Sequence, residues 1–219
     1  MSHSLAQSSR AKLFPKVPQR RKKNETRQSY ARPKTRSSPQ TIIFRKTTFG
    51  FNKIADYYRV DNRLIVDISH LKKIGGSCLT DSTIQVPNAN LDSMDIPVSY
   101  VPFRNANILS IATSWAEVIN ASSIYIGAVE EDSSGYPDCR REFYDAFEKC
   151  ISTGTKPSTK IKILTPLINL SKEEIVLKGN KLDAPLHLTW SCYKSNTTPC
   201  MECDSCYLRK KGFDNARIT

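Results

Sequence analysis

Apolar residues recur along most of the chain with the spacings of alternating strands and helices. Short β-branched runs bounded by polar residues predict buried strands, and these cover 64–68, 123–129 and 161–164. Apolar positions three and four residues apart predict amphipathic helices. The clearest helix covers 105–120, with others at 52–58, at 143–151 and after a capping box at 171–174. Strands that alternate with helices predict an α/β fold with a parallel sheet.

The helix over 105–120 is the most regular of these elements. Its predicted core stripe consists of Ile108, Ile111, Ala112, Trp115, Val118 and Ile119. We interpret the stripe as packing surface, not as a cofactor site, because the spacing alone accounts for it.

Two polar stretches are candidates for function. Ligands of open parallel sheets bind beyond the carboxyl ends of the strands, which favours the loop over 130–141. Its carboxylates, thiol and cations suit an acid or a phosphate. Residues 74–77 contain two glycines and predict a turn, because no strand directly precedes them as a phosphate cradle requires. Residues 80–100 predict an irregular surface loop or lid.

The tail carries a C-x7-C-x2-C-x2-C pattern, formed by Cys192, Cys200, Cys203 and Cys206. Four thiolates at this spacing can close a tetrahedral shell around zinc. A disulfide framework and scattered buried thiols are the alternatives. No secretory segment precedes the domain, and three cysteines within seven residues are seldom mere packing. The pattern therefore predicts a structural zinc site.

Positive charge is concentrated at the start of the chain. The formal net charge is +12, and residues 1–50 hold thirteen of the 33 Lys and Arg but only one of the 21 Asp and Glu. Residues 51–219 are therefore neutral. The low apolar content of 1–40 predicts disorder, so we divide the chain into a basic leader over 1–50 and a domain over 51–219. Organelle targeting, contact with RNA or a partner, and no function are three alternatives for the leader.

No apolar run reaches the ~18 residues that a membrane span needs. We therefore expect a cytoplasmic protein, with organelle targeting by the leader as the alternative.

Several segments resemble a known family. The 7-cyano-7-deazaguanine synthases contain four similar segments in the same order as Val101–Asn105, Asp132–Arg140, Thr189–Tyr193 and the four-cysteine loop of this chain. Ile74–Thr80 resembles a further family segment. The resemblance covers about residues 51–219. It implies a nucleotide alpha-hydrolase-like fold of the PP-loop type with a structural Zn²⁺. It also implies a homodimer.

The resemblance further implies an ATP-dependent ligase with Mg²⁺. The family converts 7-carboxy-7-deazaguanine and ammonia into 7-cyano-7-deazaguanine, a precursor of queuosine in tRNA. A carboxylate is a poor electrophile, so adenylation makes AMP the leaving group, and a second activation dehydrates the amide to the nitrile. The protein supplies positioning and charge stabilisation.

Four residues are candidates for the catalytic site. Arg104 and Arg140 could bind phosphate or the substrate carboxylate as bidentate forks. Asp132 and Asp138 could bind the purine-like base or organise magnesium. Structural alternatives remain open, because Arg104 could only cap a helix and Asp132 could only brace its loop.

The other cysteines and histidines receive structural interpretations. Cys139 lies between an acid and a cation that could activate its thiol, but amide formation by adenylation needs no covalent thiol, so we expect a packing or positioning role. Cys78 and Cys150 are expected to be ordinary buried residues. His70 and His187 are isolated, and we expect no metal role for either.

The chain departs from the family pattern at one point. Family members begin with a strand and an SGGxDS loop that holds the pyrophosphate of ATP, and no such motif occurs in this sequence. Residues 41–44 could supply a substitute strand. Two hypotheses follow: an N-terminally incomplete synthase domain, or a catalytically inactive zinc-binding fragment with a basic RNA- or partner-binding arm.

Overall fold

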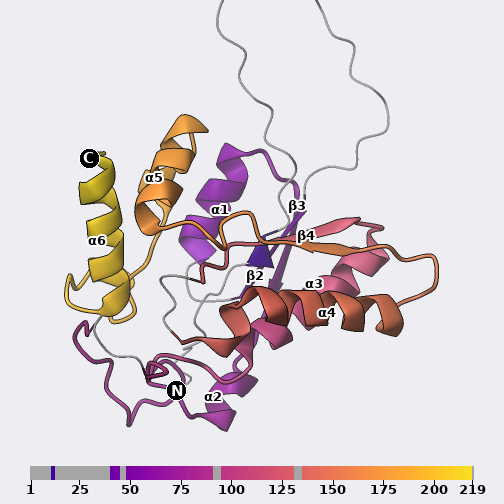
Figure 1. Ribbon diagram of the computed structural model, residues 1–219, viewed down its shortest axis with the longest axis horizontal. Helices are drawn as coiled ribbons and strands as arrows, with labels where there is room; N and C mark the ends of the chain where they lie inside the picture. The colour runs from indigo at the N-terminus through magenta and orange to yellow at the C-terminus, as the bar shows by residue number, and fades with distance from the viewer. Residues whose placement is uncertain (1–10, 13–39, 45–47, 91–94, 131–134, 219) are drawn as a thin grey trace, which may run out of the picture.

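The computed structural model describes residues 11–12, 40–44, 48–90, 95–130 and 135–218 (Figure 1). The strands are β1 (Ala11–Lys12), β2 (Gln40–Phe44), β3 (Asn62–Val66), β4 (Ser123–Ile126) and β5 (Lys162–Leu164). The α-helices are α1 (Thr48–Tyr57), α2 (His70–Ile74), α3 (Arg104–Val118), α4 (Arg141–Gly154), α5 (Lys172–Lys181) and α6 (Asp204–Ala216). Two 3-10 helices, η2 (Pro137–Cys139) and η3 (Leu186–Leu188), complete the described elements.

The strands form two small sheets. β2 pairs in parallel with β3, with Ile42 opposite Leu64, and β4 pairs in parallel with β5, with Ile124 opposite Ile163. The predicted α/β class with parallel strand pairing is therefore confirmed. The two-residue β1 adds an antiparallel edge to β4, which the sequence does not predict. β2 covers the residues that the sequence offers as a substitute strand.

Strand ends differ from the predicted ones for local reasons. The predicted strand over 64–68 ends early, because the Asp67 carboxylate accepts the Ser69 N–H at 2.7 Å and turns the chain. The predicted strand over 123–129 ends at Ile126. Its partner β5 has three residues and provides no pairing beyond Tyr125.

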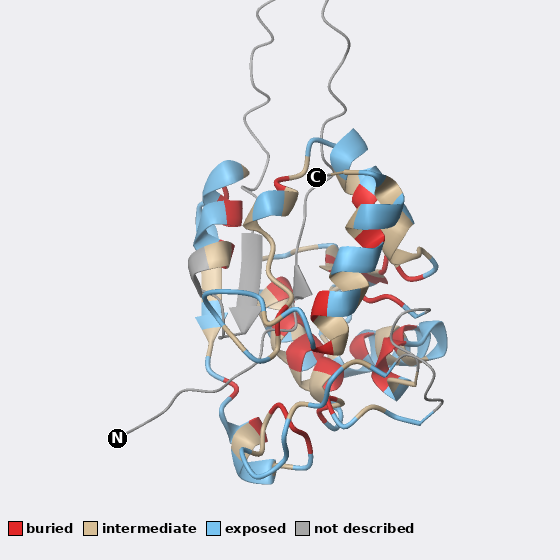
Figure 2. Ribbon diagram, turned by 90° about the vertical axis from the view of Figure 1, so that its left-hand side faces the viewer, coloured by how far each residue is buried: buried red, intermediate tan, exposed pale blue. Residues whose placement is uncertain are grey.

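The main core lies between α3 and the strands. Ile108, Leu109, Ala112 and Ala116 of α3 are fully buried, as is Ile124 of β4. Figure 2 shows buried positions on the inward faces of the helices and exposed ones outside.

The predicted stripe on α3 is wrong at one position. Val118 is 77% exposed, because it lies two residues beyond buried Ala116 and so faces the opposite side of the helix. Ile111 and Trp115 pack partly against the core.

The C-terminal helices lie side by side (Figure 1). The predicted capping box of α5 is confirmed: the Glu174 N–H donates to Ser171 Oγ at 3.3 Å, and the Ser171 N–H donates to Glu174 Oε2 at 2.9 Å. Gly212 permits the close approach of α6 to α5, since a Cβ there would lie 2.7 Å from the Cβ of Lys172.

Two further expectations can be compared with the structure. Gly75 and Gly76 have φ of +73° and +78°, which confirms the predicted turn. Cys150 is exposed, so the expectation of a buried thiol is wrong there, whereas Cys78 is buried. Cys150 lies one residue from buried Ile151 and outside the apolar face of α4.

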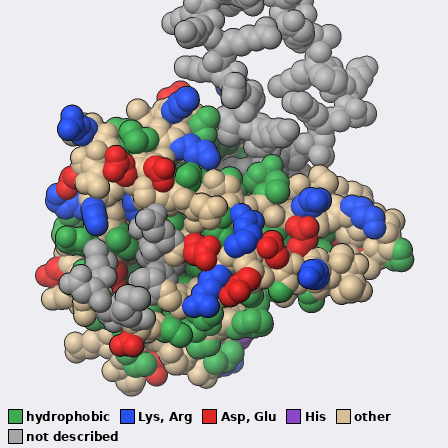
Figure 3. Space-filling model, in the orientation of Figure 1, with side chains coloured by type: hydrophobic (Ala, Val, Ile, Leu, Met, Phe, Trp, Pro, Cys, Tyr) green, Lys and Arg blue, Asp and Glu red, His purple; other side chains and the backbone are tan. Residues whose placement is uncertain are grey.

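Charge is dispersed over the folded part of the chain. Figure 3 shows Lys and Arg interspersed with Asp and Glu on the face of Figure 1, as expected from the neutral balance of residues 51–219. Within the described ranges, no helix is long and apolar enough to cross a membrane.

Candidate active site and metal centre

The start of α3 is tied to η2 by Asp138. This carboxylate is buried, and its Oδ2 accepts the backbone N–H of Asn105 at 2.9 Å. The Asp138 carbonyl accepts from Asn105 Nδ2 at 2.8 Å and from the Tyr144 hydroxyl at 3.0 Å. Burial raises the pKa of Asp138, while the Asn105 N–H and the charge of Arg104 oppose the rise. Asp138 therefore caps the helix that carries Arg104.

Arg104 is the first residue of α3 and the most unusual cation of the site. Its Nε is buried and has no hydrogen-bond partner among the described residues. A buried donor left without an acceptor costs ~1–3 kcal/mol. Phe103, directly before it, adopts a left-handed backbone with φ of +54°, a conformation that costs ~1–2 kcal/mol for residues with a Cβ. Both features are typical of functional sites, where local cost accompanies a binding role.

Three tyrosines lie within electrostatic reach of the Arg104 guanidinium. Burial raises the pKa of Tyr136, Tyr144 and Tyr193, and the nearby positive charge of Arg104 opposes the rise in each case. The three hydroxyls are therefore neutral at physiological pH. The Tyr136 hydroxyl also contacts Ser99 Oγ at 2.6 Å. The positive charge of Arg104 therefore acts on three neutral hydroxyls and on the carboxylate that caps its helix.

The structure brings some predicted residues together and not others. Arg104 and Asp138 lie in one cluster. Arg140 is exposed, with Nη1 3.7 Å from Glu142 Oε1, and Asp132 lies outside the described residues. Cys139 is buried, and its Sγ accepts from Asn105 Nδ2 at 3.4 Å, as expected of a packing role.

Sequence reasoning did not select the tyrosines. Tyr136 and Tyr193 both stand in segments that carry the family resemblance, and that position is the signal that could have identified them. Their hydrophobic rings suggest core packing, and only the fold shows that their hydroxyls meet near Arg104.

The four predicted metal ligands converge. Sγ atoms of Cys192, Cys200, Cys203 and Cys206 all lie within 4.8 Å of one another. A tetrahedral shell with metal–sulfur bonds of ~2.3 Å places its sulfurs ~3.8 Å apart, and the Cys200 and Cys206 sulfurs are 3.9 Å apart. Three of the four residues are buried and Cys200 is half-buried. The donor set and its spacing fit one thiophilic metal ion.

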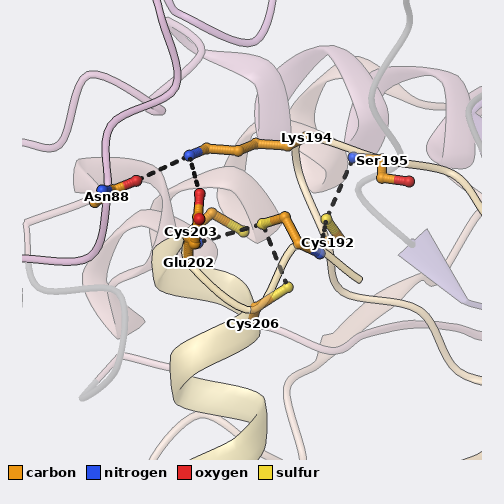
Figure 4. A network of polar contacts seen from close by, with 8 residues as sticks. Asn88, Cys192, Lys194, Ser195, Glu202, Cys203 and Cys206 are labelled. Atoms are coloured by element: carbon orange, nitrogen blue, oxygen red, sulfur yellow. Dashed lines mark hydrogen bonds and ion pairs between the residues drawn. The ribbon is translucent and has the colours of Figure 1, made fainter. Parts of the chain in front are cut away.

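Backbone amides support the sulfurs of this cluster (Figure 4). Cys192 Sγ accepts the N–H groups of Ser195 at 3.3 Å and Cys200 at 3.4 Å. Burial raises the pKa of the Cys200 thiol, but N–H groups of Glu202 and Cys203 outweigh it and bring the pKa to about 6. Such donors stabilise thiolates, which are the form that binds metal.

Helix α6 and residues 88–89 contact the cysteine loop over 192–206, which we call the metal loop. Cys203 is the N-cap of α6. Lys194 Nζ donates to Asn88 Oδ1 at 2.9 Å and lies 3.2 Å from Glu202 Oε2 (Figure 4). The Ala89 N–H donates to the Glu202 carbonyl at 2.9 Å. The cysteine cluster therefore joins the end of the chain to residues 88–89.

Comparisons with known proteins agree with this geometry. The family model of queuosine biosynthesis protein QueC matches residues 45–217. A 7-cyano-7-deazaguanine synthase of Chlorobaculum parvum is 58% identical over 168 residues, which are 77% of this chain and 74% of that protein. The synthase of Chlorobaculum tepidum is 60% identical over 163 residues, 74% of this chain and 72% of the relative. Because both the family model and the relatives cover most of the chain, it belongs to the QueC family of queuosine biosynthesis proteins.

Proposed function

We propose that this chain acts in the ATP-dependent conversion of 7-carboxy-7-deazaguanine and ammonia to 7-cyano-7-deazaguanine, and that Arg104 binds the substrate carboxylate. The buried Nε of Arg104, without an acceptor among the described residues, carries the proposal. A guanidinium binds a carboxylate through two parallel, charge-assisted hydrogen bonds. Such a ligand satisfies a donor that has no acceptor in the described part of the chain.

The chemistry follows from the charge of the substrate. One carboxylate oxygen attacks the α-phosphorus of ATP and displaces pyrophosphate. The product of this step is an acyl adenylate. Ammonia attacks the acyl carbon, expels AMP and gives the amide after loss of a proton. A second adenylation, now of the amide oxygen, permits loss of AMP and a proton to form the nitrile. Arg104 orients the acid and then faces the oxygen that carries developing charge.

The remaining candidates receive supporting roles. Asp138 holds the first turn of α3 through the Asn105 N–H, so we assign it to positioning Arg104. Exposed Arg140 is a candidate for the phosphates of ATP, which binds with Mg²⁺. The role of Asp132 in binding the base stays a prediction, as do a homodimer and RNA contact through residues 1–50.

We assign Zn²⁺ to the four cysteines. Soft thiolate ligands in a tetrahedral arrangement select zinc over hard cations such as Mg²⁺. Four protein ligands leave no coordination position for a substrate, so the metal is structural. The alternative of a catalytically inactive zinc-binding fragment is not favoured by the relatives, which are named as synthases.

The test is AMP formation by the purified chain. It is incubated with MgATP, ammonium and 7-carboxy-7-deazaguanine, and AMP is measured by chromatography and the nitrile by mass spectrometry. We expect AMP that requires the acid. Arg104→Gln should raise the acid concentration needed for half-maximal rate, and exposed Lys149→Gln on α4 should not. AMP formation that is absent, or that is the same without acid, would contradict the proposal.

A further inference from the structure

Tyr193 links the metal loop to the candidate acid site. It directly follows Cys192, and its ring packs against both the main core and the cysteine cluster. Its hydroxyl lies within hydrogen-bonding reach of Ser205, between Cys203 and Cys206, and of the hydroxyl of Tyr136. One side chain therefore packs against the metal loop and lies within reach of Tyr136, directly before η2.

Tyr136 continues this connection to Arg104. Its hydroxyl lies 2.6 Å from Ser99 Oγ, its ring is 5.8 Å from that of Tyr100, and it lies within electrostatic reach of the guanidinium. The Cys139 N–H donates to the Tyr136 carbonyl at 3.0 Å, which ties the tyrosine to η2. Tyr136 therefore contacts Ser99 and Tyr100 through its side chain and η2 through its carbonyl, and both contacts lie near Arg104.

A second set of contacts runs between the metal loop and the polar loop before α3. Besides the contacts of Lys194 and Ala89, the Asn90 N–H donates to Asp204 Oδ1 at 3.2 Å, and Val86 packs against both clusters. Figure 4 shows Lys194 reaching from the cysteine loop to Asn88. Residues 86–90 therefore hold the metal loop in place, and Tyr193 belongs to this immobilised loop.

We propose that Tyr193 is a positioning residue through which the metal loop holds Tyr136 beside Arg104. The inference rests on the proposed function, because it assigns Arg104 to the acid. The Tyr193 hydroxyl restricts the Tyr136 side chain, and the bound acid meets a site whose geometry is set before it arrives. The metal loop thereby contributes to acid affinity without touching the acid.

The test compares Tyr193→Phe with the wild-type chain. Phenylalanine keeps the ring packing and removes the hydroxyl, so the ligand shell should keep one metal per chain by elemental analysis. Loss of a hydrogen bond between positioning groups should weaken acid binding about 3- to 10-fold by calorimetry. Hydrogen exchange should become faster in the peptide over 135–144 and stay unchanged over β4.

Tyr207→Phe is the matched control. Tyr207 directly follows Cys206 and is 49% exposed, so removal of its hydroxyl should change neither acid affinity nor exchange over 135–144. Unchanged affinity and exchange in Tyr193→Phe would overturn the inference, and so would loss of the metal from that variant.

The hydrogen-exchange measurement distinguishes failure of the proposed function from failure of the positioning role of Tyr193. If the wild-type chain binds no acid, the proposed function fails, while faster exchange over 135–144 in Tyr193→Phe still supports the positioning role. If Arg104→Gln weakens binding and Tyr193→Phe changes neither readout, the proposed function stands and the inference is overturned.

Discussion

Arg104 combines properties that ordinary surface arginines lack. Its Nε is buried without an acceptor in the described part of the chain, and it follows a residue with a left-handed backbone. Both features oppose folding, and a bound carboxylate would offset the first. Under the proposed function, Arg104 exchanges stability for binding, as functional residues often do.

Replacing Arg104 by Met should separate these two effects. Methionine keeps much of the packing volume and removes the unpaired donor, so we expect an unchanged or higher thermal midpoint. Acid affinity should fall roughly 10- to 100-fold, because charge-assisted hydrogen bonds contribute ~1.5–3 kcal/mol. Calorimetric binding and thermal unfolding of the same sample provide the measurement. A lower midpoint with wild-type affinity would show that Arg104 has a structural role instead.

Asp138 gives a prediction about pH. Burial raises its pKa in the folded chain, so its contribution to stability is fully present below the ordinary pKa of ~3.9 and is lost as pH rises through the folded-state value. Asp138→Asn keeps an oxygen to accept the Asn105 N–H and removes this dependence. The stability of the variant relative to wild type should therefore improve from about pH 4 to neutrality. Urea unfolding at several pH values measures it, and a constant difference would contradict the assignment.

At the scale of elements, the metal loop has the most consequence. It begins α6, whose glycine packs against α5, and it binds residues 88–90. Four sulfurs this close repel one another when ionised. The pKa of the Cys206 thiol is accordingly raised to about 12, mainly by burial and further by the neighbouring cysteines. A bound cation relieves that repulsion and joins the elements.

Removal of the metal should therefore loosen α6. We expect one zinc per chain after dialysis, and a strong chelator should lower the thermal midpoint by about ten degrees or more, which is roughly 3–5 kcal/mol or more at this chain length. Cys203→Ser should reproduce the loss, because Cys203 is fully buried and caps α6. Exposed Cys150→Ser is the control and should change neither metal content nor midpoint. A chain that is metal-free and equally stable would refute the metal site.

The sequence predicts which helices and strands form better than it predicts where they end or which distant residues they contact. The cysteine spacing and the Ser171 capping box depend on local geometry, so both were foreseeable. Cys150 and Val118 were misplaced because apolar residues also occur outside the buried face of a helix. The meeting of Tyr136 with Tyr193 depends on how distant loops pack, which no local pattern encodes.

For the whole molecule, one core joins the two sheets. Leu64 and Val66 of β3 pack against the cluster that contains α3 and Ile124 of β4. Sheets this small bury little on their own, so the shared core holds them. Loss of side-chain volume at its centre should consequently destabilise the whole chain.

Ile124→Ala tests that expectation. The side chain is fully buried, and truncation of a buried isoleucine costs ~2–5 kcal/mol. Ile65→Ala on β3 is the matched control, because Ile65 is 45% exposed, and its cost should be below ~1 kcal/mol. Denaturant unfolding of both variants gives the comparison, and equal effects would argue against a single core.

The most direct test of the account is calorimetric titration of the metal-loaded chain with 7-carboxy-7-deazaguanine and, separately, with 7-deazaguanine, which lacks the carboxylate. We predict one acid per chain and binding at least 10-fold weaker for the analogue, because only the acid pairs with Arg104. Equal affinity for the two compounds, or no binding of the acid, would contradict the account.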